Sequence, residues 1–257
     1  MRSGGQVRVR GVPRRGSGLL RRRQRGAPLM GAPARSLRNN GLSIAFGVLF
    51  LAALAGQALA GHAEFNEEQS SHGLPGIGLG SYLMSSQFAV DVVENWRSEY
   101  LQFFLYVYAT VWLLQLGSPE SKPAERMGDE TDPEQEVGRW SRRRSPPSAR
   151  ARGARRKLFS VSLGLVMGTI FLASWGVQAW SGWSAYNYQQ VEQHHRASVG
   201  FAEYLTSGDF WSRTSQNWQS EFLAVGSMAV FSVYLRQRGS PESKPVGAPH
   251  SATEESG

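Results

Sequence analysis

Cysteine is absent from this 257-residue chain. Its absence excludes disulfide bonds, thiolate metal sites and a cysteine nucleophile. The chain also lacks a phosphate-binding glycine loop and a recognisable nucleophile motif. Histidine is scarce, with five residues, and none lies in an apolar stretch, which argues against a bis-histidine haem within a helical bundle. We therefore expect no cofactor and no metal. The sequence favours a non-enzymatic protein and does not exclude an enzyme.

Acidic residues are outnumbered by basic ones, 20 against 28, which gives a net charge of +8. The cations are segregated: 11 precede residue 41, 11 lie in 117–157 and three follow residue 235. Basic residues therefore fill alternate loops, which is the positive-inside pattern of membrane proteins. No nucleic-acid-binding fold accompanies the basic tail, so no nucleic acid partner is expected.

Two sequence segments occur twice. The heptapeptide GSPESKP at Gly117–Pro123 returns letter for letter at Gly239–Pro245, 122 residues later. The same offset relates ENWRSEY at 94–100 to QNWQSEF at 216–222. A repeat of this length indicates two copies of one structural unit.

Each copy contains two apolar stretches, at about 42–60 and 96–116 in the first and 158–180 and 218–235 in the second. Their lengths approach the ~20 residues that a helix needs to cross a bilayer. We predict an all-α, polytopic membrane protein with four transmembrane helices, arranged as two helical-hairpin repeats of parallel orientation. A cleaved secretory signal ending at Ala58-Leu59-Ala60 is an alternative for the first stretch. The matching stretch in copy two lies mid-chain, which favours a span.

The predicted organisation follows from these stretches. Residues 1–36 form a disordered, Arg-rich cytoplasmic tail, and Met30 is an alternative start of the natural chain. Residues 37–123 are repeat one, 124–156 a basic cytoplasmic linker, 157–245 repeat two and 246–257 a disordered tail, with both termini cytoplasmic. Ser85 or Ser86 is expected to cap the second helix and Gly117 to end it.

The Asn-Trp-x-Ser-Glu box is expected to open the second helix of each copy. In copy two the apolar run 222–235 spans only about 21 Å, against ~30 Å of hydrocarbon, so Glu221 is drawn toward the membrane. The candidate proton or cation site consists of four polar residues: Glu99, Glu221, Asn95 and Asn217. The favoured interpretation is structural: Trp96 and Trp218 are interfacial anchors, and the helix dipole favours a carboxylate in the first turn.

Other aligned residues predict packing. Small residues at Ser43 and Gly47 match Gly164 and Gly168, which predicts the seam where helices approach closely. Gln57 aligns with Gln178 and is expected to hydrogen-bond between helices. For GSPESKP a helix stop is favoured over a docking surface between the copies or with a partner. His72 aligns with His194, a weak signal for a metal.

The residues 38–43 (RNNGLS), the segment 61–66 (GHAEFN), the repeated boxes and the GSPESKP turns resemble an uncharacterised bacterial membrane family catalogued as a domain of unknown function. The likeness covers residues 36–246 and implies the bacterial inner membrane, but no activity. We expect a non-enzymatic accessory or structural protein whose partners are the lipid bilayer and a second copy or another membrane protein. The alternative is a small transporter or channel that uses the paired carboxylates.

Overall fold

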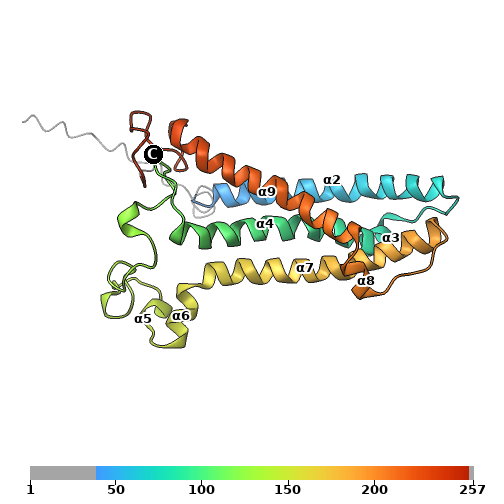
Figure 1. The fold of residues 1–257 in the computed structure, drawn as a ribbon, viewed down its shortest axis with the longest axis horizontal. Coiled ribbons are helices and arrows are strands. Elements are labelled where there is room, and N and C mark those ends of the chain that lie inside the picture. Colours follow the sequence, from blue (N-terminus) through green and yellow to red (C-terminus); the bar gives the residue numbers. More distant parts are fainter. Residues whose placement is uncertain (1–38, 255–257) are drawn as a thin grey trace, which may run out of the picture. The chain divides into compact units, whose positions relative to one another are not determined.

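The computed structural model describes residues 39–254, and this part of the chain is helical without strands. The elements, in order, are α2 (Gly41–Ser71), α3 (Leu79–Leu83), α4 (Ser86–Trp112), η1 (Ala124–Arg126), η2 (Gly138–Trp140), α5 (Pro147–Arg150), α6 (Ala154–Ser160), α7 (Ser162–Tyr188), the π-helical η3 (Gln189–Gln193), α8 (Phe201–Leu205) and α9 (Gly208–Tyr234) (Figure 1). The chain divides into two compact units, residues 1–54 and 55–257, so α2 begins in one and ends in the other. The predicted tail 1–36 lies outside the described residues.

Two helices in the described part are long and apolar enough to cross a membrane: α2, with 31 residues, and the continuous helical segment Ser162–Gln193, with 32. At 1.5 Å per residue each reaches about 46–48 Å, well beyond the hydrocarbon thickness. Both therefore extend past the predicted spans 42–60 and 158–180. The other two predicted spans overlap α4 and α9, which do not meet the same test of length and composition.

Helices α4 and α9 begin with the same cap. The Ser85 hydroxyl accepts a hydrogen bond from the Phe88 amide at 3.2 Å, and Ser207 accepts one from Phe210 at the same distance. The cap expected at Ser85 is confirmed. It satisfies one of the amides that a helix start leaves without a partner.

The expected helix end at Gly117 is wrong. Helix α4 ends at Trp112, and Leu113 is already extended. The heptapeptide folds back instead, and the Ser121 hydroxyl accepts the Gln115 amide at 2.9 Å. Gly117 lies within this turn at φ +85°, where a residue with a side chain is strained.

The second heptapeptide repeats this turn: Gly239 has φ +85°, and the Ser243 hydroxyl accepts the Gln237 amide at 2.9 Å. Each lysine then bonds to the segment that follows it. Lys122 Nζ donates to the Gly128 carbonyl at 3.2 Å, and Lys244 Nζ donates to the carbonyls of Pro249, His250 and Ala252 at 3.2, 2.9 and 3.1 Å. Serine and lysine thus have local structural uses, but GSPESKP forms a turn beyond the end of each helix and not the helix stop expected of it.

An asparagine holds the loop after the first long helix of each copy. The Asn66 side chain accepts from the Ile77 amide at 2.8 Å and donates to its carbonyl at 3.0 Å. Asn187 makes the same two bonds with Val199, at 2.8 and 3.1 Å. Each asparagine therefore pairs with its loop residue as a strand residue would pair with a neighbour.

A ring nitrogen reaches each of these loop carbonyls as well. His62 Nε2 lies 2.7 Å from the Ile77 carbonyl oxygen, and the Trp183 indole donates to the Val199 carbonyl at 2.9 Å. His62 and Trp183 differ in kind but take the same place in their loops. The replacement of one ring by the other therefore preserves the contact.

A buried tyrosine closes each loop against a glycine. Tyr82 and Tyr204 are 1% and 0% exposed, and burial raises the pKa of both phenols. A Cβ placed on Gly61 would meet the Tyr82 hydroxyl at 2.3 Å, and one on Gly182 would meet that of Tyr204 at 2.4 Å. A side chain at either position would therefore force the tyrosine to shift from its buried place. Tyr204 also forms the hydrophobic core with Ala179 and Phe210.

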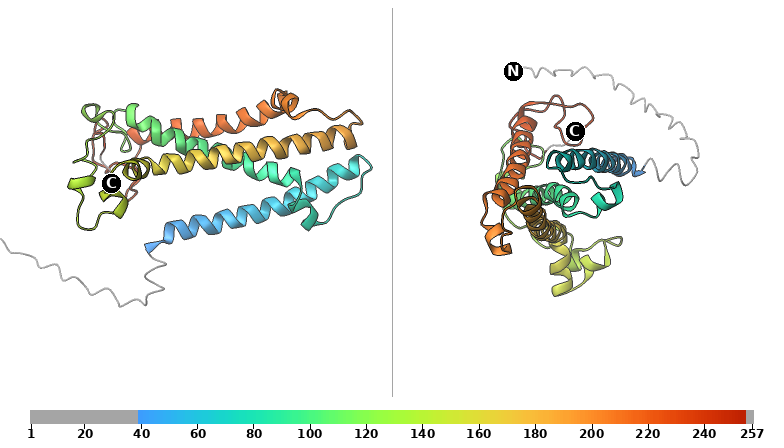
Figure 2. Two further views of the ribbon diagram at one scale, coloured as in Figure 1. Left: turned by 90° about the horizontal axis from the view of Figure 1, so that it is seen from below. Right: turned by 90° about the vertical axis from the view of Figure 1, so that its right-hand side faces the viewer.

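Helix α7 runs alongside α4 (Figures 1 and 2). Gly164 and Gly168 face the rings of Tyr108 and Phe104, with 2.4 and 2.9 Å from an added Cβ to the nearest ring carbon. Half of the predicted seam therefore lies between α7 and α4. Ser43 and Gly47 belong to the amino-terminal unit, and their part in the seam stays a prediction.

Candidate functional site

The two Asn-Trp-x-Ser-Glu boxes lie inside helices, and the expectation that they open them is wrong. Helix α4 starts at Ser86 and α9 at Gly208, so each box begins nine residues into its helix. The serine caps at Ser85 and Ser207 move the helix start upstream. Because the dipole acts within the first turn, it does not account for Glu99 and Glu221.

The structure brings Glu99 and Glu221 together. The Glu221 carboxylate lies beside the Ser98 hydroxyl and interacts electrostatically with Glu99. Glu99 is exposed and Glu221 half-buried. Asn95 is exposed and donates to the Asp91 carbonyl of its own helix at 3.2 Å. The acidic pair therefore exists, and the part of Asn95 and Asn217 in a cation site stays a prediction.

The two tryptophans of the boxes differ. Trp96 is 40% exposed, as an interfacial anchor requires. Trp218 is half-buried, and its indole nitrogen is enclosed by protein. The anchor role stays a prediction for both tryptophans. Trp218 makes an additional contact inside the protein.

That contact is with Arg97, a buried cation that the sequence analysis did not select. Arg97 is 0% exposed, and its Cζ lies 5.8 Å from the centroid of the Trp218 ring. Nη1 donates to Gln178 Oε1 and, at 2.9 Å, to Thr214 Oγ1. Nη2 donates to the carbonyls of Arg213 and Thr214 at 3.3 and 3.2 Å.

Arg97 therefore links three helices, since it comes from α4, Gln178 from α7 and Thr214 from α9. The planar guanidinium donates in several directions at once, which a lysine cannot reproduce. The predicted interhelical bond of Gln178 is present, but its partner is Arg97. We call Arg97, Gln178, Thr214 and Trp218 the Arg97 cluster.

The Arg97 cluster contains more donors than acceptors. Three of its buried N–H groups have no hydrogen-bond partner within residues 39–254: Arg97 Nε, Gln178 Nε2 and Trp218 Nε1. An unpaired buried donor costs about 1–3 kcal/mol. The cluster fixes which helices meet, but its net contribution to stability is smaller than its hydrogen bonds suggest.

Carboxylates surround a second arginine, Arg213, which directly precedes Thr214 in α9. Arg213 Nη1 lies 3.6 Å from Glu94 Oε2, and Arg213 Nε lies 3.3 Å from Asp209 Oδ1. Burial raises the pKa of Glu94, and the nearby Arg213 opposes that rise. Burial also raises the pKa of Asp91, against the hydrogen bond from Gln87. Helices α4 and α9 are therefore joined by the Arg213–Glu94 ion pair as well as by Arg97.

The glutamates of the two heptapeptides also meet. The Glu120 side chain lies next to that of Glu242, and this proximity raises the pKa of Glu242. The Tyr106 hydroxyl donates to Glu120. All three residues line a cavity of about 600 Å³ between α4 and α9. Part of GSPESKP thus contacts its other copy, as the docking interpretation expects.

The aligned histidines approach each other, with 6.0 Å between the ring centroids of His72 and His194. In the part of the chain that the structure describes, no group of three or more histidine and acidic side chains is arranged to hold a metal ion. His72 Nδ1 contacts the Glu68 carbonyl at 2.9 Å, a local bond.

Together these features define an all-helical protein with two helices of membrane-crossing length and a buried arginine cluster between helices. The DUF6766 family model, a domain of unknown function, matches residues 33–255, so the chain belongs to that family. This confirms the resemblance to a family of unknown function. No curated protein and no solved structure matches the chain.

Proposed function

We propose that the protein is a four-span protein of the bacterial inner membrane that acts as a non-enzymatic accessory or structural component. Its spans form two hairpins of the same orientation, with the termini and the linker 124–156 in the cytoplasm. The Arg97 cluster carries the proposal, because it uses the most deeply buried cation of residues 39–254 to join α4, α7 and α9.

The paired contacts support a duplicated unit. The caps at Ser85 and Ser207, the loop asparagines and the two heptapeptide turns each recur 121 or 122 residues apart with the same bonds. Two copies with the same fold direction place both polar loops on one side of the membrane and all GSPESKP turns on the other.

Cysteine labelling tests the topology, and the cysteine-free chain is a suitable background. Single cysteines at the exposed positions Ser71 and Ala197 should react with a membrane-impermeant maleimide from outside intact cells. A cysteine at exposed Ala124 should react only after the cells are opened. Labelling of Ser71→Cys and Ala197→Cys from opposite sides would contradict the proposal.

A partner test addresses the accessory role. Glu242 is exposed on the second heptapeptide, whereas its serine and lysine are buried in the turn. A tagged protein purified in mild detergent should retain a stoichiometric membrane partner or second copy, and E242K should release it. The matched control is E254K at the other exposed glutamate near the carboxyl end of the described chain. Purification as a lone monomer would refute the accessory role.

A second candidate function is a small proton or cation transporter. The observation in its favour is the approach of Glu99 and Glu221, since two like charges at one place favour binding of a proton or a cation between them. Proteoliposomes should show a proton or monovalent cation flux that E99Q/E221Q abolishes and E67Q/E203Q leaves unchanged. Equal flux for both double variants would eliminate the site.

A further inference from the structure

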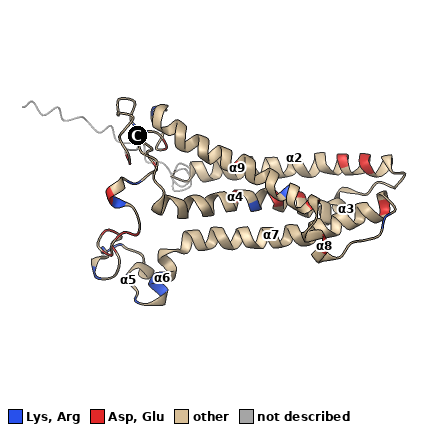
Figure 3. Ribbon diagram, viewed as in Figure 1, with Lys and Arg blue, Asp and Glu red and all other residues tan. Residues whose placement is uncertain are grey.

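The linker between the two copies is divided by charge. Residues 125–136 contain six acidic side chains and one arginine, whereas residues 139–157 contain nine cations and no acid. Figure 3 shows the basic and acidic residues of this region at the end of the helices where α6 leads into α7. Part of the basic half, residues 139–157, also lines a cavity.

The cavity has a volume of about 580 Å³. Its lining residues are Asp132, Pro133, Gly138, Arg139, Trp140, Arg150, Arg152 and Arg156. Four guanidinium groups thus face one carboxylate. That carboxylate, Asp132, is already ion-paired with Arg156 at 3.3 Å, so three arginine charges in the lining have no carboxylate of their own. We call this the arginine cavity.

Two of its arginines are held in place. The Arg139 guanidinium lies 4.9 Å above the centroid of the Trp140 ring. Arg150 Nη2 donates to the carbonyls of Arg142 and Arg143, at 3.0 Å to Arg142. Arginine in a fixed orientation matches the oxygens of a phosphate better than a mobile cation does.

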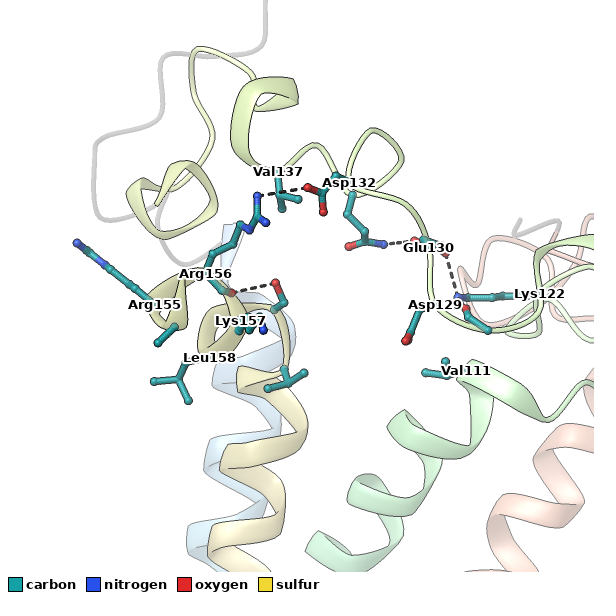
Figure 4. A pocket seen from close by; sticks show the side chains of 15 residues that line it. Val111, Lys122, Asp129, Glu130, Asp132, Val137, Arg155, Arg156, Lys157 and Leu158 are labelled. Atoms are coloured by element: carbon teal, nitrogen blue, oxygen red, sulfur yellow. Dashed lines mark hydrogen bonds and ion pairs between the residues drawn. The ribbon is translucent and has the colours of Figure 1, made fainter. Parts of the chain in front are cut away.

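A larger cavity of about 1140 Å³ shares Asp132 and Arg156 with the arginine cavity. Figure 4 shows its other walls, with Val111 from the end of α4 and Leu158 from α6. Its lining thus passes from charged side chains to the apolar ends of the helices. This is the order of surfaces that a phospholipid meets, from headgroup to acyl chain.

We propose that the arginine cavity binds the phosphate headgroup of an anionic membrane phospholipid. The inference rests on the proposed function, which puts the linker at the cytoplasmic face of the membrane. Arg156 belongs to α6, directly before α7, a helix long enough to cross the bilayer. Trp140 is 48% exposed beside the arginines, and tryptophan is enriched at headgroup depth. Basic pockets at the cytoplasmic ends of spans are suited to acidic headgroups.

Native mass spectrometry of the full-length protein in non-ionic detergent tests the proposal. Phosphatidylglycerol and phosphatidylcholine with identical acyl chains are the probes. We expect tighter binding of phosphatidylglycerol, and R139Q/R152Q should weaken it about thirtyfold, because each of the two arginines near a lipid phosphate contributes on the order of 1 kcal/mol. The control R143Q/R144Q removes the same charge from the same linker outside the cavity lining and should retain the affinity.

Three results would overturn the proposal. Equal weakening by both double variants would show a diffuse charge effect, and equal binding of the two lipids by the wild type would show no headgroup site. Competition by glycerol 3-phosphate at the same concentration as the lipid would show a site for a free anion. All four positions are exposed, so both variants should keep the wild-type helix content and elution volume. If R139Q/R152Q does not, the single variants R152Q and R144Q replace the pair.

The membrane assignment is tested separately. Alkaline carbonate should leave the protein in the membrane pellet. Extraction into the supernatant would overturn the proposed function, whereas a membrane-integrated protein without a preference for phosphatidylglycerol would overturn only the arginine cavity.

Discussion

Arg97 and Gln219 occupy the same place in the two Asn-Trp-x-Ser-Glu boxes, 122 residues apart, and their surroundings are opposite. Arg97 is fully buried and bonds to two other helices, whereas Gln219 is exposed. The residues around them, asparagine, tryptophan, serine and glutamate, are the same in both boxes. The box therefore lies in a helix in both copies. The residue at its one variable position determines which copy makes side-chain hydrogen bonds to other helices.

The same division holds elsewhere. Identical pairs such as Asn66 and Asn187 make contacts within their own copy. Asp91 and Arg213 share an offset of 122 but carry opposite charges, and Arg213 pairs with Glu94 of the other copy. A duplicated unit with identical charges at its contact surface would repel itself. Divergence at these positions converts that repulsion into attraction.

Substitution of Arg97 should give the largest effect. R97A removes the donor for Gln178 and Thr214 and leaves a void, so we expect a loss of about 3 kcal/mol in the free energy of unfolding. Unfolding by SDS in mixed micelles measures it. Q219A, the matched change in the other copy, should stay within about 0.5 kcal/mol. Equal losses of stability in R97A and Q219A would contradict the different roles of the two boxes.

Glycine 182 should give the next effect. G182A places a methyl group 2.4 Å from the Tyr204 hydroxyl and should destabilise by about 1–3 kcal/mol. G176A is the control in the same helix, because a Cβ there meets nothing within 4 Å of the described chain. Removal of the hydroxyl in G182A/Y204F should recover part of the loss. A neutral G182A would show that the tyrosine moves without cost.

The loop asparagines test equality between the copies. N66A and N187A each remove two hydrogen bonds to one backbone residue, and each should cost about 1–2 kcal/mol. Thermal unfolding of the two variants should shift by similar amounts. If only one variant loses stability, the two loops have the same hydrogen bonds but contribute unequally to the free energy of unfolding.

The smallest expected effect is a dependence on pH. Burial raises the pKa of Glu94 and Asp91 above the unfolded values, so the folded state holds their protons more tightly. Their contribution is most favourable below the unfolded pKa and declines as the pH rises through the folded pKa. D91N/E94Q should therefore lose less stability than the wild type between pH 4 and pH 7. A steeper decline in the double variant would contradict the burial of these carboxylates.

The sequence by itself determined the helical class, the two long apolar helices and the family, because apolar length and repeated motifs are properties of the chain order. It also predicted the Ser85 cap and the local use of GSPESKP, which depend on neighbouring residues. The helix boundaries did not follow from the apolar run, since α4 ends at Trp112 although the run continues to Leu116. Beyond that end, the Ser121 hydroxyl accepts a hydrogen bond from the Gln115 amide.

Only the tertiary structure decided what Arg97 does. In the sequence it is one of three cations outside the basic loops, with nothing to separate it from Arg196 or Arg213. Its partners come from 81 and 117 residues away, on two other helices. Burial of a charge is a property of the packed helices around it and not of the residues beside it in the chain. For the same reason the pairing of Glu120 with Glu242 and the enclosure of four arginines became visible only once the chain was folded.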